Sequence, residues 1–268
     1  QLEEIINSGE NVLLCDCRFD LVDPLIGRKS YEESHIPGAI YVDLDKDLSG
    51  EKTGANGRHP LPSPEAWAKT KARLGINPNT LVVAYDKQGS VYASRLWWML
   101  KSTGHANVRV LDGGLDAWNG PMGSIPRAPT PCNQPIAPMP YAGLVLVDEV
   151  VANLETKKNK IIDARSEDRF HGQNETLDPV GGHIPGAMNR FFKNNLNATA
   201  FKTPEQLFKE FSESLGTTKA SEVIHQCGSG VTACHNLLAM ELAGFKGSRL
   251  YAGSWSEWCA DPERPVEL

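Results

Sequence analysis

The sequence has no run of apolar residues that approaches the length of a membrane-spanning helix, and no signal peptide precedes its first element. It also lacks a basic stripe of the kind that binds nucleic acid, because acids and bases are interspersed and the formal net charge is −6. We therefore expect a soluble, cytoplasmic protein. Its expected partners are small molecules or proteins, with no nucleic acid and no membrane.

The six cysteines lack the close paired spacings of a zinc site or of a Cys-x-x-Cys redox motif. We therefore predict no bound metal and expect most cysteines to be reduced and buried. Cys15 and Cys17 stand two apart in a strand-like run, so both face the same side, where core packing is favoured over a redox pair. The chain begins at Gln1 without a methionine, which suggests that residues before it are missing.

An internal repeat organises the 268 residues. A buried strand pattern ending in Asp-x-Arg occurs at 13–18 and again at 161–165, and the sequence His-Ile-Pro-Gly-Ala follows at 35–39 and again at 183–187. A repeat of this length indicates duplicated domains, since the units of solenoid proteins are far shorter.

Each copy alternates strand-like and helix-like segments. The pairs Ser63-Pro64 and Thr203-Pro204 each place an N-cap before a proline, which predicts that amphipathic helices begin there. We predict an α/β fold of two tandem domains, each with a mainly parallel sheet flanked by helices. The expected domains cover residues 1–120 and 142–268, and the proline-rich stretch 121–141 is expected to be a semi-rigid extended linker.

The stretch 227–236 contains the candidate nucleophile, Cys227. A strand-like run precedes Cys227, and a helix-like segment follows its glycine loop. Backbone N–H groups near a helix N-terminus can converge on a sulfur and lower the pKa of a thiol, so we expect several amides around Cys227 and a nucleophilic role for it. The first copy has Asp86 at the matching position, and a charge is a poor replacement for a thiol that merely fills a core. The two halves are therefore expected to differ in role.

The duplicated blocks and the single Cys-Gly-Ser-Gly-Val-Thr loop resemble the two-domain rhodanese-type sulfurtransferases over nearly the whole chain. Within that family the loop is similar to that of 3-mercaptopyruvate sulfurtransferases, whereas thiosulfate sulfurtransferases typically carry Arg and Lys after the cysteine. A loop without these charges favours a monoanionic donor over the thiosulfate dianion.

The resemblance implies that Arg169 binds the carboxylate of the substrate. Arg165 looks structural, because its counterpart Arg18 occurs in the half without the cysteine. A second arginine that mercaptopyruvate enzymes often carry before the His-Ile-Pro-Gly block is missing from 174–180, and Arg190 is the candidate replacement.

The expected mechanism is a double displacement without metal or organic cofactor. Cys227 takes sulfur from a small-molecule donor, 3-mercaptopyruvate, as a persulfide, and a thiol such as thioredoxin, or cyanide, removes it. The Ser229 and Thr232 hydroxyls are expected to donate to the sulfur or to protonate the pyruvate enolate. The remaining predicted substrate-binding residues belong to the same loop and are Gly228, Gly230 and Val231.

Alternative interpretations stay open at this stage. Cys227 could be an inert buried thiol, and Arg169 a surface ion-pair residue. Trp255 and Trp258 are candidates to line the pocket, although core packing is the simpler interpretation. Other possible functions are thiosulfate sulfur transfer and a non-enzymatic regulatory module. A phosphatase is disfavoured, because Ala233 stands where a phosphate-binding arginine would be needed.

Overall fold

The computed structural model describes residues 2–8 and 11–268, which form two compact units. The first unit comprises residues up to Gly50, Leu61–Ala142 and Ala198–Ala200, and the second comprises Glu51–Pro60, Gly143–Asn197 and Phe201–Leu268. The domain limits given above stay a prediction. The structure differs from the predicted limits at one place that matters for function. Residues Glu51–Pro60, here called the 51–60 segment, lie within the predicted first domain but pack within the second unit.

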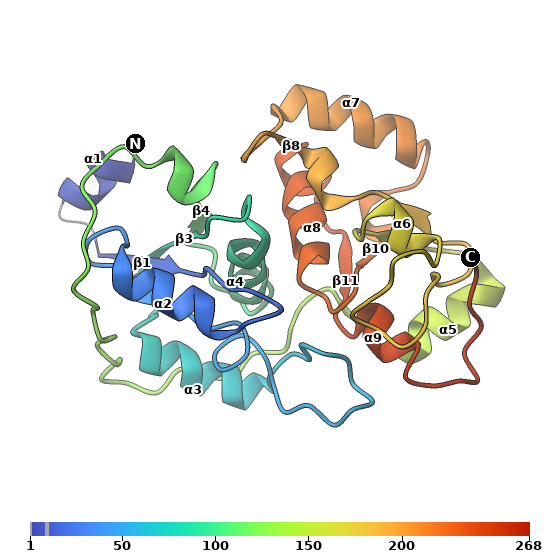
Figure 1. Cartoon of the computed structure of the whole chain (residues 1–268), viewed down its shortest axis with the longest axis horizontal. Helices are drawn as coiled ribbons and strands as arrows, with labels where there is room; N and C mark the ends of the chain where they lie inside the picture. Colours follow the sequence, from blue (N-terminus) through green and yellow to red (C-terminus); the bar gives the residue numbers. More distant parts are fainter. Residues whose placement is uncertain (1, 9–10) are drawn as a thin grey trace. The chain divides into compact units, whose positions relative to one another are not determined.

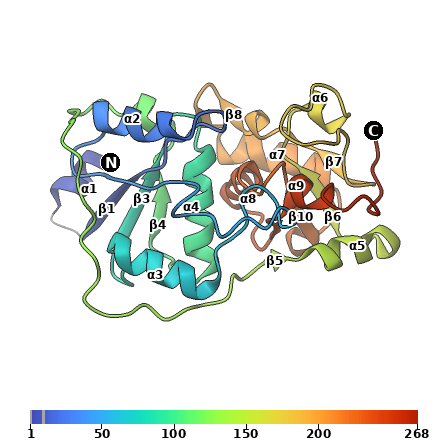
Figure 2. The same cartoon turned by 60° about the horizontal axis from the view of Figure 1, so that its bottom comes forward.

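The first unit contains a four-stranded sheet in the order β2-β1-β3-β4, in which neighbouring strands are parallel. Figure 2 shows α2 and α3 on opposite faces of this sheet. The elements in chain order are α1 (Leu2–Asn7), β1 (Val12–Asp16), α2 (Leu25–Glu33), β2 (Ile40–Tyr41), α3 (Pro64–Leu74), β3 (Leu81–Tyr85), α4 (Val91–Ser102), β4 (Val108–Val110) and the 3₁₀ helix η1 (Gly114–Ala117).

The second unit repeats this plan with one more strand, in the parallel order β5-β11-β10-β6-β7. Figure 1 shows two of these strands, β10 and β11, next to α8. The elements from residue 144 onward are β5 (Leu144–Val145), α5 (Val147–Thr156), β6 (Lys160–Asp163), α6 (Glu167–Phe170), β7 (Met188–Asn189), η2 (Phe192–Asn195), β8 (Leu196–Asn197), β9 (Ala200–Phe201), α7 (Pro204–Leu215), η3 (Ala220–Glu222), β10 (Val223–Gln226), α8 (Thr232–Leu242), β11 (Arg249–Tyr251) and α9 (Ser254–Trp258).

Apolar side chains that alternate between the two faces of the strands form a core on each face of the second unit's sheet. Ile161 and Ile224 pack in one apolar cluster with residues of α5 and α9. Their neighbours Ile162 and Val223 pack in a second cluster with residues of α7 and α8. Successive side chains of a strand point to opposite faces, so helices must cover both sides of such a sheet.

The expected helix starts are confirmed. Ser63 caps α3 by accepting from the Ala66 N–H, and Thr203 forms a capping box with Gln206 at the start of α7. The two histidines of the repeated block have matching structural roles. The backbones of His35 and His183 form isolated antiparallel bridges with Gly123 and Glu267, respectively.

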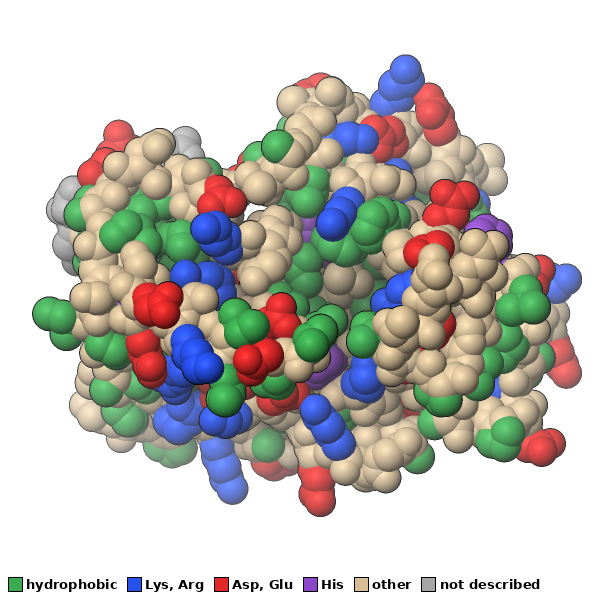
Figure 3. All heavy atoms as spheres, viewed as in Figure 1, with side chains coloured by type: hydrophobic (Ala, Val, Ile, Leu, Met, Phe, Trp, Pro, Cys, Tyr) green, Lys and Arg blue, Asp and Glu red, His purple; other side chains and the backbone are tan. Residues whose placement is uncertain are grey.

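The proline-rich stretch 121–141 contains no helix or strand. It is nevertheless attached to the first unit, because the Arg127 N–H donates to the Tyr31 hydroxyl and the Cys132 N–H donates to the Ala72 carbonyl. Figure 3 shows acidic and basic side chains interspersed over the displayed face, in line with the sequence pattern. Among the described residues, no helix is long and apolar enough to cross a membrane.

Candidate active site

Cys227 directly follows β10, and α8 begins at Thr232, so the predicted strand, glycine loop and helix are all present. The loop requires its second glycine. Gly230 has φ +75°, and a Cβ added there would lie 2.3 Å from the Ala252 carbonyl oxygen. The start of α9 holds the loop from the other side, since the Trp255 N–H donates to the Cys227 carbonyl at 2.9 Å.

The Cys227 sulfur is close to the loop amides but not surrounded by them. The Gly230 N–H donates to Sγ at 3.1 Å, and Cys227 is only 2% exposed. Within the described residues no second amide donates to this sulfur. One amide donor is fewer than the several that the sequence predicted. The prediction that the Ser229 and Thr232 hydroxyls donate to Sγ also finds no matching contact there. Val231 is buried at the N-cap position of α8.

Ser229 has a different partner. Its hydroxyl oxygen lies 2.7 Å from Nδ1 of His59, a residue of the 51–60 segment, and both residues are buried. Sequence reasoning missed His59, because this residue lies outside both copies of the repeated blocks. The His35 ring instead contacts the carbonyl oxygens of Tyr31 and Ile125, as a structural residue would.

Arg169 lies at the loop, as predicted. A Cβ added to Gly228 would lie 3.4 Å from its Nη2 and 3.8 Å from its Nη1. Nε and Nη2 each donate at 2.9 Å to the Glu175 carboxylate, which is buried. Burial raises the pKa of Glu175, but the Leu177 N–H and Arg169 lower it more, and the resulting pKa lies below its ordinary value. Arg169 is thus oriented by an ionised side chain.

A second guanidinium comes from the 51–60 segment. The same added Cβ on Gly228 would lie 2.8 Å from Nη2 of Arg58. Nη1 of Arg58 pairs with the carboxylate of Asp178, whose side chain is 3% exposed. Burial raises the pKa of Asp178, while the neighbouring Arg58 opposes that rise. The sequence pattern offered no signal for Arg58, since it precedes α3 of the first unit in the chain.

The other two arginines are engaged elsewhere. Arg165 is buried, donates to both carboxylate oxygens of Asp163 and lies over the Trp255 ring, so the structural role predicted for it fits its contacts. Arg190 does not replace the missing arginine. Its Nη2 donates to Glu210 at 2.8 Å, and its guanidinium lies 4.1 Å from the centre of the Phe211 ring, because α7 packs over it.

The neighbouring aromatic and sulfur side chains belong to the core. Trp255 and Trp258 are both fully buried, and their indole N–H groups donate to the carbonyls of Val180 and Pro265. They pack rather than line a pocket. Cys234 is buried on α8, where its thiol donates to the Gly230 carbonyl, and burial raises the pKa of Cys15 and of Cys17.

The corresponding loop of the first unit holds a carboxylate. Asp86 follows β3 and accepts hydrogen bonds from the N–H groups of Gln88, Ser90, Tyr92 and Ala93, at 2.9 to 3.0 Å. The buried charge is accommodated because four amides satisfy it, which agrees with the argument that the matching Cys227 is not a thiol that merely fills a core. Burial raises the Asp86 pKa against the effect of these amides. The loop geometry is thus able to hold an anion.

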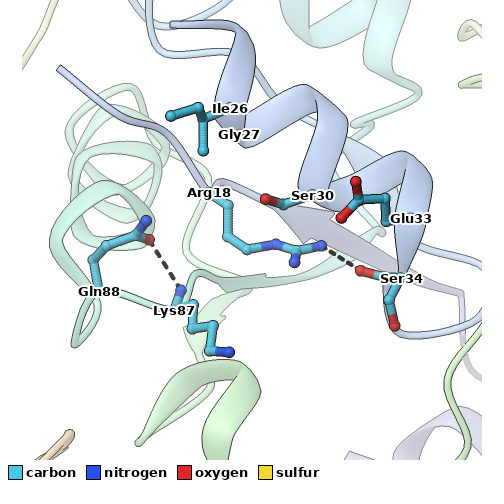
Figure 4. Close-up of a pocket in the computed structure, with 8 residues that line it drawn as sticks. All are labelled: Arg18, Ile26, Gly27, Ser30, Glu33, Ser34, Lys87 and Gln88. Carbon is cyan, nitrogen blue, oxygen red and sulfur yellow. Dashed lines mark hydrogen bonds between the residues drawn. The ribbon is translucent and has the colours of Figure 1, made fainter. Parts of the chain in front are cut away.

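A cavity of about 380 Å³ opens beside that loop. Figure 4 shows Arg18 between the loop and α2, with Nη2 donating to the Ser34 carbonyl at 2.6 Å. Arg18 also pairs with Asp16, just as Arg165 pairs with Asp163. Because Asp86 already occupies the loop amides, these amides are not available to an external anion.

The sequence matches the model of the rhodanese-like domain twice, over residues 1–121 and 146–261. The chain belongs to the rhodanese-like family. The predicted resemblance and fold class are therefore confirmed, with one such domain in each half. Among the described residues of this rhodanese-like protein, no group of three or more His, Cys, Asp or Glu side chains could hold a metal ion.

Its relatives are sulfurtransferases. The chain is 44% identical to a probable 3-mercaptopyruvate sulfurtransferase of Pseudomonas aeruginosa, over 97% of this chain and 93% of the relative. It is 37% identical to thiosulfate sulfurtransferase of Rattus norvegicus, over 89% of this chain and 82% of the relative. The solved structure of 3-mercaptopyruvate sulfurtransferase from Leishmania major superposes with a TM-score of 0.82 at 29% identity, covering 98% of this chain and 74% of that one.

Proposed function

We propose that this protein is a sulfurtransferase that takes the sulfur of 3-mercaptopyruvate onto Cys227 and passes it to a thiol or to cyanide. The observation that carries the proposal is the position of Cys227, which follows a parallel strand, receives the Gly230 N–H and adjoins the two guanidinium groups at Gly228. A thiolate at this position has a hydrogen-bond donor beside it and cations next to the place where an anionic donor must bind.

The chemistry takes two steps. The Cys227 thiolate attacks the donor sulfur, so that a sulfur–sulfur bond forms, the carbon–sulfur bond breaks and its electron pair leaves on the pyruvate enolate. A proton delivered to the enolate carbon gives pyruvate, and the Ser229 hydroxyl, hydrogen-bonded to His59, is the proposed proton relay. In the second step an acceptor thiolate attacks the outer sulfur and restores the Cys227 thiolate. Arg169 holds the substrate carboxylate.

The acceptor and the cellular location are further parts of the proposal. A reduced dithiol such as thioredoxin fits the second step, because it supplies both the attacking thiolate and the thiol that resolves the product. A cytoplasmic location fits that acceptor and the free state of the six cysteines.

Mass spectrometry after exposure to donor tests the first step. We expect the protein to gain one sulfur on Cys227, and the Cys227→Ser variant to gain none and to lose turnover. Sulfur transfer that persists in Cys227→Ser would refute the scheme. Absence of added sulfur with each donor tried would favour a regulatory module instead.

Thiosulfate is the second candidate donor, because relatives of both specificities match this chain. Parallel steady-state assays separate the two. We expect kcat/KM to be larger for mercaptopyruvate, and the reverse order would make thiosulfate the preferred donor.

A further inference from the structure

We propose that the first unit carries a binding site for a small organic phosphate, in a cavity lined by residues of α2, of α3 and of the proline-rich stretch 121–141. This inference goes beyond the proposed function, because every lining residue belongs to the first unit and none takes part in the proposed sulfur transfer. The cavity has a volume of about 620 Å³. Sites for small molecules commonly have volumes of about 300–1,000 Å³, so the cavity is large enough for an organic ligand.

Positive charge is in excess in this cavity. Among the described residues, its lining includes four cationic side chains and two carboxylates, namely those of Arg28, Lys46, Arg73 and Arg127 and those of Asp43 and Asp47. Basic side chains also gather over α2 and α3 on the face that Figure 3 displays. The chain as a whole has a net charge of −6. A local excess of cations in an acidic protein favours an anionic ligand.

Both carboxylates already have partners within the protein. Asp43 is buried and accepts from the N–H groups of Asp45 and Lys46, at 2.9 and 3.0 Å. Asp47 is also buried, accepts from the Asp43 N–H at 2.9 Å and pairs with Arg73. The ammonium group of the exposed Lys46 has no hydrogen bond or ion pair within the described residues. The two acids therefore close their own turn and neutralise Arg73 alone.

Two of the remaining cations are held in place without being neutralised. Nη1 of Arg127 donates to the Gly38 carbonyl at 3.1 Å, which fixes the guanidinium and leaves its charge. The Arg28 guanidinium lies 4.8 Å from the centre of the Tyr41 ring. Its ion pair with Glu32 is weak, because the two groups are 3.9 Å apart and about half exposed. An anion in the cavity can therefore accept from arginines that are already positioned.

The fold does not require this pattern of charges. Val42 and Arg190 take matching places in the two units, because the N–H of each donates at 2.9 Å to the carbonyl of the aspartate that ends β1 or β6. In the first unit the next residue is Asp43. In the second unit Phe191 and Phe192 follow, with ring centres 5.0 Å apart. Since the same plan accepts an aromatic pair there, the charged turn of the first unit serves another purpose than folding.

The chemistry of the lining favours a phosphate ester over a bare anion. The planar donor forks of arginine match the oxygens of a phosphate group. Pro126, Ala128 and Pro129 provide an apolar wall beside the Tyr41 ring. Inorganic phosphate would leave this wall and most of the volume unused. The ligand is therefore a dianionic phosphate group attached to an apolar or cyclic body.

Isothermal titration calorimetry of the intact chain with phenyl phosphate tests the site. We expect binding in the wild type and an affinity about ten- to a hundredfold lower in Lys46→Met/Arg127→Met, which loses charge-assisted hydrogen bonds. Inorganic phosphate and the monoanion phenylacetate should each bind more weakly than phenyl phosphate. Wild-type affinity in the double variant, or no binding of phenyl phosphate by the wild type, would overturn the inference. Equal binding of inorganic phosphate would overturn the assignment of an organic ligand.

Lys29→Met/Arg109→Met is the matched control. It removes the same two charges from exposed residues of the first unit that do not line the cavity, so phenyl phosphate should bind as it does to the wild type. An equal loss in both double variants would show a diffuse effect of charge.

Arg169→Met separates this cavity from the loop of Cys227. We expect this variant to bind phenyl phosphate with wild-type affinity, and a loss of binding would place the phosphate in the second unit and contradict the inference. Sulfur transfer by Lys46→Met/Arg127→Met should equal that of the wild type, which also shows that the variant is folded.

Discussion

Nδ1 of His59 lies 2.7 Å from the Ser229 hydroxyl oxygen, although 170 positions separate the two residues in the chain. A hydroxyl that hydrogen-bonds an imidazole can pass a proton to a carbon that becomes negative during the reaction. Because the pair adjoins Cys227, this relationship predicts a defined pattern of kinetic losses.

Replacing His59 with Asn or Ser229 with Ala should lower kcat for mercaptopyruvate by about a hundredfold, the lower end of what positioned acid–base groups contribute. The double variant should lose little more than either single variant, because the two residues act as one relay. Steady-state kinetics of the three variants measure this. If the loss of kcat in the double variant equalled the product of the two single losses, the residues would have independent roles. The control is His171→Asn, which changes an exposed histidine and should leave kcat at the wild-type value.

Gly230→Ala should destabilise the protein by about 2 kcal/mol or more and abolish sulfur transfer, because the added Cβ meets the Ala252 carbonyl in a backbone with positive φ. Gly244→Ala is a matched control. Gly244 has φ +90° but nothing within 4 Å of an added Cβ, so only the conformational cost of about 1 kcal/mol applies. Urea unfolding compares the two, and equal losses would show that the contact with Ala252 is unimportant.

Asp86→Asn should lower the free energy of unfolding by about 1–3 kcal/mol, since four backbone N–H groups lose part of their acceptor. Asp116 forms an exposed ion pair with Lys87, so Asp116→Asn should change stability by less than about 1 kcal/mol. Chemical denaturation of both variants measures the difference. An Asp86→Asn protein as stable as the wild type would mean that these amides gain little from a carboxylate.

Glu175→Gln should make stability less dependent on acid pH. The folded-state pKa of Glu175 lies below its ordinary value of 4.5, so the ionised form stabilises the folded protein above that pH. This contribution is lost as the pH falls through the lowered pKa. The variant should therefore be less stable than the wild type at pH 7, by about 1.5–3 kcal/mol for lost charged hydrogen bonds, and the gap should narrow in acid. Denaturation at several pH values measures the gap, and a constant gap would contradict the assigned shift.

Much of the fold was predictable from local patterns. The caps at Ser63 and Thr203 act on the nearest turn of their own helices, and the strand before Cys227 begins with two apolar, β-branched residues. The repeat predicted two units of one plan, and the residue after β10 was predicted as the nucleophile from the strand, glycines and helix around it. These features depend on neighbours in the chain, so a sequence can reveal them.

The surroundings of the sulfur were decided only by tertiary structure. Arg58 and His59 reach the Cys227 loop because the 51–60 segment packs with the second unit, and neither periodicity nor a motif records a contact across 120 or 170 positions. The same holds for Arg190, which lies near the motif in sequence but on Phe211 in space. The amino-acid sequence thus determined the duplicated fold and the position of the thiol. The long-range packing of one loop decided which cation and which histidine stand beside it, because side chains so far apart in the chain meet only once the domain has folded.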